Sequence, residues 1–81
     1  MTQAEKLLIH MRANPLGWSI EDIEKACRLA GLSCMKPSNG SHYKISHPGV
    51  EHILTVPFKR PIKPVYVRML LQMIDGVKAE R

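Results

Sequence analysis

A change in hydrophobic periodicity near residue 31 constrains the fold more than any other feature of this sequence. Before it, apolar residues recur at the spacing of one helical face. After it, residues 41–47 alternate, with Tyr43 and Ile45 on one side and polar residues on the other. Asn39-Gly40 and Pro48-Gly49 are turn signals that bracket this alternating segment. The pattern predicts an antiparallel meander of three short strands, over residues 32–36, 41–47 and 51–56.

Two helices are predicted before the strands and one after them. Residues 2–13 carry apolar side chains at helical spacing, and Asn14-Pro15-Leu16-Gly17 ends that helix. The second helix begins after Ser19, which forms a capping box with Asp22, and ends before Gly31. The third runs from Pro64, which suits a first helical turn, to Val77. The predicted order is α-α-β-β-β-α.

The length of 81 residues predicts a single domain of the α+β class. Amphipathic helices beside a three-stranded antiparallel sheet must pack on one face of it to bury their apolar sides. We expect the helices to cover the inward side chains Tyr43, Ile45, Leu54 and Val56. The opposite face would then expose His42, Lys44 and Ser46 to solvent.

Basic residues outnumber acidic ones by 12 to seven, which gives a formal charge of +5. Such a surplus favours polyanionic partners (nucleic acid, an anionic membrane surface or an acidic protein), although it equally suits simple solubility. No apolar run is long enough to cross a membrane, and the N-terminus does not read as a signal peptide. Cys27 and Cys34 are expected to be reduced, in the cytoplasm.

His42 is the central candidate for chemistry. Imidazole exchanges protons near neutral pH, and RNA supplies its own nucleophile, the 2′-hydroxyl. A histidine could therefore cleave RNA without a metal, while nearby lysines stabilise the charge on the phosphate. The competing interpretation is a polar residue that caps a turn at the start of a strand. The residue types alone leave both interpretations open.

A set of motifs in fixed order resembles the HicA toxins across residues 19–74: Gly40-Ser41-His42-Tyr43-Lys44, then Ile53-Leu54-Thr55-Val56-Pro57, then Pro61-Ile62-Lys63-Pro64. The resemblance implies a fold like that of double-stranded-RNA-binding domains, mRNA cleavage by His42 without a cofactor, and inhibition by a HicB-like antitoxin. Two features depart from the family. Residues 1–14 form an additional N-terminal helix before the core domain of residues 19–77, and Val65-Tyr66 follows the Lys-Pro step in place of Gly-Thr.

Basic residues from several segments are expected to meet near one edge of the sheet and contact RNA phosphates. Lys44 is a strong candidate because strand alternation places it on the face of His42, and Lys36 is the other. Scattered solvated charges would look the same in sequence. The predicted RNA-binding set is Gly40, Ser41, Lys36, Lys44, Lys59, Arg60 and Lys63.

Three other interpretations compete with the ribonuclease. The same basic face could hold double-stranded RNA without cutting it, or it could dock an acidic protein. Histidine and cysteine side chains also suggest a metal site, but their spacing matches no standard zinc pattern, in which ligands come in close pairs. We therefore expect no metal at the four residues concerned, which are Cys34, His42, His47 and His52.

Overall fold

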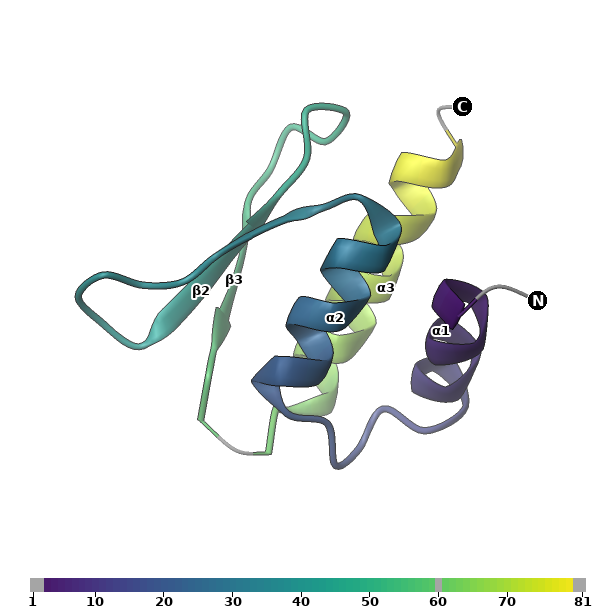
Figure 1. The fold of residues 1–81 in the computed structure, drawn as a ribbon, viewed down its shortest axis with the longest axis horizontal. Coiled ribbons are helices and arrows are strands. Elements are labelled where there is room, and N and C mark those ends of the chain that lie inside the picture. The colour runs from purple at the N-terminus through teal and green to yellow at the C-terminus, as the bar shows by residue number, and fades with distance from the viewer. Residues whose placement is uncertain (1–2, 60, 80–81) are drawn as a thin grey trace.

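The described part of the chain forms three helices and three strands in the order that the sequence predicts. The computed structural model describes residues 3–59 and 61–79 (Figure 1). The α+β class and the α-α-β-β-β-α order are confirmed. The elements are α1 (Gln3–Ala13), α2 (Ile20–Ala30), β1 (Ser33–Met35), β2 (His42–Ser46), β3 (Leu54–Pro57) and α3 (Pro64–Ala79).

The sheet is an antiparallel meander with β2 at its centre, between β1 and β3. Ile45 of β2 lies opposite Cys34 of β1 on one side and opposite Leu54 of β3 on the other. The third strand begins at Leu54, three residues later than predicted, because the β2–β3 turn is longer than its Pro-Gly pair suggests. His47 organises that turn: its carbonyl accepts from the Val50 N–H, and its imidazole Nδ1 accepts from the Gly49 N–H.

All three helices lie on the same side of the sheet, as predicted (Figure 1). Helices α2 and α3 contact the sheet, at β1 and β3 respectively, and α1 packs outside them on α2 and α3. An ion pair between Arg12 and Asp75 joins α1 to α3 on the surface. None of the described helices is both long enough and apolar enough to span a membrane.

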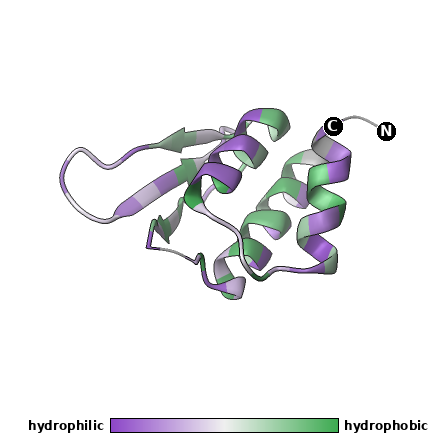
Figure 2. Cartoon of the chain, turned by 60° about the horizontal axis from the view of Figure 1, so that its bottom comes forward, coloured by the Kyte–Doolittle hydropathy of each residue, from purple (hydrophilic) through white to green (hydrophobic). Residues whose placement is uncertain are grey.

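The core forms between the inner face of the sheet and the helices. The inward side chains of β2 and β3 (Tyr43, Ile45, Leu54 and Val56) are at most 6% exposed, which confirms the predicted strand alternation. They belong to one cluster with buried residues of every helix, including Met11, Ile23 and Leu70. Figure 2 shows the helices banded in hydrophilic and hydrophobic colours, as expected of elements with a single buried side.

Both ends of α2 are fixed by the predicted capping residues. Ser19 and Asp22 form the complete capping box, in which Asp22 accepts from the Ser19 N–H at 3.0 Å and Ser19 Oγ accepts from the Asp22 N–H at 3.4 Å. At the other end, Gly31 adopts φ 80°, and its N–H bonds to carbonyls of the last turn. The first cap determines where α2 begins, and the second determines where the chain leaves α2 and turns toward β1.

We predict that Ser19→Ala lowers the free energy of unfolding by about 1 kcal/mol, because the first turn of α2 loses the side-chain acceptor of its cap. Urea unfolding followed by circular dichroism measures the change. Ser38→Ala, in the exposed β1–β2 loop, is the matched control and should leave stability within about 0.5 kcal/mol of the parent. Equal effects of the two substitutions would show that the capping box does not stabilise the fold.

Candidate functional site

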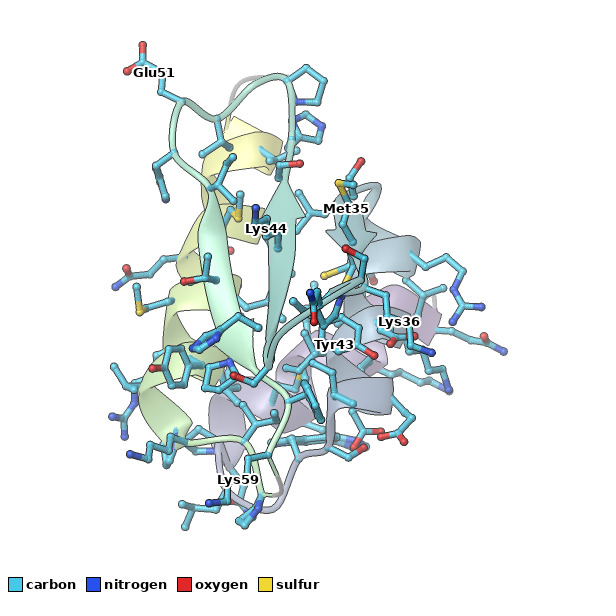
Figure 3. All side chains as sticks on the ribbon, turned by 90° about the vertical axis from the view of Figure 1, so that its left-hand side faces the viewer. Met35, Lys36, Tyr43, Lys44, Glu51 and Lys59 are labelled. Carbon is cyan, nitrogen blue, oxygen red and sulfur yellow. The ribbon has the colours of Figure 1, made fainter. Side chains whose placement is uncertain are left out.

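His42 is the first residue of β2 and is exposed on the outer face of the sheet, as strand alternation predicts. It pairs with Pro57 at the end of β3. Two residues further along, Lys44 is exposed on the same face, opposite Met35 of β1 and Thr55 of β3. Figure 3 looks onto this face, where Lys44 lies over β2 with Met35 beside it. The structure therefore places the histidine and a lysine side by side on a solvent-exposed surface.

The backbone around His42 is held from both sides. The Phe58 N–H donates to the Ser41 carbonyl at 3.1 Å, which continues the pairing of β2 with β3 beyond the last strand residue. On the inner face, the buried ring of Tyr43 meets the ring of Phe58 edge to face, with centroids 6.0 Å apart. Because both neighbours of His42 are fixed in this way, the fold determines the face of the sheet on which its side chain lies.

The hydroxyl of Ser41 contacts the imidazole of His42, with Oγ 3.2 Å from Nδ1. If Oγ donates, Nδ1 is the acceptor and the Nε2 of a neutral ring carries the proton. If Nδ1 carries the proton, Oγ accepts and Nε2 is free to act as a base. In both cases the serine engages the ring nitrogen nearer the backbone and leaves Nε2 to face a ligand.

A hollow of about 310 Å³ opens beside His42. The β1–β2 loop forms one wall and the outer face of the sheet forms the other. Both Lys36 and Lys44 line it, together with the side chain of Met35. Gly40 allows the loop to close toward β2, because its φ of 138° is a conformation that residues with a side chain rarely adopt. A histidine and two lysines are thus among the residues that line one cavity.

Two other predicted RNA-binding lysines lie elsewhere. Lys59 and Lys63 border a second hollow, of about 500 Å³, between the connector that precedes α3 and the loop that precedes α2. In Figure 3, Lys59 lies at the lower end of the molecule, well away from Lys44. The predicted basic set is therefore divided between two hollows, and Arg60 falls outside the described residues.

The structure adds lining residues that the sequence did not single out. Met35 lies next to Lys44 because of the β1–β2 register, and its side chain is 63% exposed. Ser38 and Asn39 also line the His42 hollow, from the loop. Side-chain alternation along β1, together with its pairing to β2, could have predicted that Met35 lies on the same face as Lys44. Apart from the Asn39-Gly40 turn, no sequence feature predicts how the β1–β2 loop folds back beside the sheet.

The side chains of His47, Cys27 and Cys34 have structural surroundings. His47 accepts a hydrogen bond within its own turn. Cys27 is buried and Cys34 half-buried, and both are free thiols. A hydrogen bond with Cys34, together with burial, raises the pKa of Cys27, so this thiol stays protonated at neutral pH. Within residues 3–59 and 61–79, no three histidine, cysteine or acidic side chains cluster as metal ligands would.

Comparison of this chain with models of protein families, with curated protein sequences and with solved structures found no match in any of the three. The resemblance to the HicA toxins therefore rests on the ordered motifs of the sequence, and the site rests on its own geometry.

Proposed function

We propose that this chain is a HicA-like ribonuclease that cleaves mRNA in the cytoplasm with His42 as its catalytic residue and without a metal. One observation carries the proposal: His42 borders a hollow that also holds Lys36 and Lys44, while Ser41 contacts its Nδ1. The Gly40-Ser41-His42 segment and the motifs that follow it support the same conclusion, since they resemble those of HicA toxins.

The chemistry follows from this arrangement. The 2′-hydroxyl oxygen of a nucleotide attacks the adjacent phosphorus while the bond from phosphorus to the 5′-oxygen breaks. The 2′-proton must leave and the 5′-oxygen must gain one. With one histidine at the site, His42 serves one of these transfers and water serves the other. The ammonium groups of Lys36 and Lys44 stabilise the negative charge that builds on the phosphate oxygens.

A HicB-like antitoxin is the expected protein partner, because an unrestrained ribonuclease of this kind would poison the cell that makes it. The surplus of five positive charges suits an acidic inhibitor as well as RNA. The main alternative is a module that holds double-stranded RNA on the same basic face without cutting it. The ribonuclease needs His42 for cleavage, whereas a binding module would hold RNA without this histidine.

We predict that His42→Ala lowers the rate of RNA cleavage by about 10²-fold to 10⁴-fold, which is the usual contribution of a general acid or base. Gel analysis of an RNA incubated with the purified chain in EDTA measures it. His52→Ala removes an exposed histidine from the far turn and should keep full activity. If His42→Ala cut RNA at the rate of the parent, the ribonuclease site would lie elsewhere. If the parent bound RNA but never cut it, the binding-module alternative would replace our proposal.

A second prediction concerns salt. Each phosphate contact contributes about 0.7 to the slope of log affinity against log salt concentration for single-stranded RNA. We expect Lys36→Ala and Lys44→Ala each to lower that slope by about this amount when binding is measured with the inactive His42→Ala chain. Lys6→Ala, an exposed lysine on α1 in the layer farthest from the sheet, is the control. An equal change with Lys6→Ala would mean that the two lysines act only through net charge.

A further inference from the structure

The second hollow differs in character from the one beside His42. Its surface is mainly apolar, and its lining includes the side chains of Leu16, Pro57, Pro61, Ile62 and Pro64. We call it the proline groove. Prolines have no backbone N–H to offer to a phosphate or to a base edge. Three of the residues that line the groove therefore offer no backbone donor, and the N–H groups of Leu16 and Ile62 already donate within the protein.

The proline groove is built by contacts between its two walls. The Ile62 N–H donates to the Trp18 carbonyl at 2.9 Å and ties the connector to the loop before α2. That loop is held by the Trp18 indole, which donates to the Asn14 carbonyl at 2.6 Å, and by the Leu16 N–H, which donates to Asn14 Oδ1 at 3.2 Å. Three connector prolines restrict the other wall. The groove is consequently shaped before any ligand arrives.

Its apolar surface is open to solvent and its rim is cationic. Leu16 is 63% exposed, although its neighbour in the groove, Ile62, is fully buried. Among the described residues that line the groove, the charged ones are Lys59 and Lys63. An apolar hollow that is also lined by two lysines matches a peptide that offers an apolar side chain flanked by carboxylates.

The groove also adjoins the candidate site. Pro57 lines it and lies directly opposite His42 in the β2–β3 register. A chain seated in the groove and continuing along β3 would therefore reach the surface over which RNA must approach His42. A ligand bound in the groove is therefore placed to affect the access of RNA to His42.

From these observations we infer that the proline groove is the docking site for an acidic segment of a partner protein, which inserts an apolar side chain beside Leu16 and pairs its carboxylates with Lys59 and Lys63. The binding stands on the groove alone. Its consequence, the blocking of RNA at His42, rests on the proposed ribonuclease function.

The test uses three synthetic hexapeptides and the full chain. The first peptide has two acidic residues on each side of a leucine–phenylalanine pair. The second replaces the acids by their amides, and the third replaces the apolar pair by alanines. Amide shifts in ¹H–¹⁵N spectra locate binding. We expect the first peptide to shift Gly17, Lys59 and Ile62 at millimolar concentration, and to bind at least about ten-fold more tightly than the other two.

Two variants assign the contacts. Leu16→Asp should weaken binding of the first peptide at least about ten-fold, because it places a carboxylate where the apolar side chain sits. The residue is exposed, so the fold tolerates the change. Ile9→Asp, at an exposed apolar position on α1, is the matched control and should leave binding unchanged. Charge reversal by Lys59→Glu with Lys63→Glu should weaken binding by a similar factor.

Other outcomes overturn the inference. Shifts at Asn39 and Gly40 instead of the groove would place the peptide at the His42 hollow. Groove shifts with oligouridine but not with the acidic peptide would assign the groove to RNA. Equal binding of all three peptides, or binding of none of them, would contradict the docking of an acidic partner. Cleavage assays separate the two proposals: groove binding by a chain that never cuts RNA contradicts only the ribonuclease, and cutting by a chain that binds no peptide contradicts only the docking site.

Discussion

The burial of one face of β2 determines the rest of this structure. Tyr43 and Ile45 must enter the core because helices on one side of a small sheet have few other apolar residues to cover. Because side chains alternate between the two faces of a strand, the residues between and beside Tyr43 and Ile45 must lie on the outer face. His42 and Lys44 are exposed for that reason, and the same alternation brings Met35 next to Lys44 through the register with β1.

This arrangement separates the side chains that stabilise the fold from those of the candidate site. The side chains that hold the sheet lie on its inner face, and the candidate site lies on its outer face and in the loop that curls over it. Ser41 links the two. Its carbonyl completes the pairing with Phe58, while its hydroxyl contacts the imidazole of His42. The basic connector likewise has two roles, since buried Ile62 anchors it while lysines on either side remain exposed.

The elements that local chemistry fixes were predictable from sequence. The capping box of Ser19, the left-handed Gly31 and the alternation of β2 each depend on neighbours within a few residues. Longer-range geometry was not predictable. The late start of β3 depends on hydrogen bonds of the His47 turn, and the hollow beside His42 depends on how far the β1–β2 loop folds back. The division of the lysines between two hollows arises because the connector bonds to the Trp18 carbonyl, a pairing that no sequence spacing reveals.

The central claim is that the 2′-hydroxyl of RNA attacks the adjacent phosphorus with His42 as the proton donor or acceptor, and the ends of the cleaved strands record that chemistry. The most direct measurement is mass spectrometry of a short RNA after incubation with the purified chain in EDTA. Attack by the 2′-oxygen predicts a 2′,3′-cyclic phosphate, or the phosphate formed when it hydrolyses, on one product and a 5′-hydroxyl on the other. An uncut RNA, or products that carry 5′-phosphate and 3′-hydroxyl ends, would contradict the account.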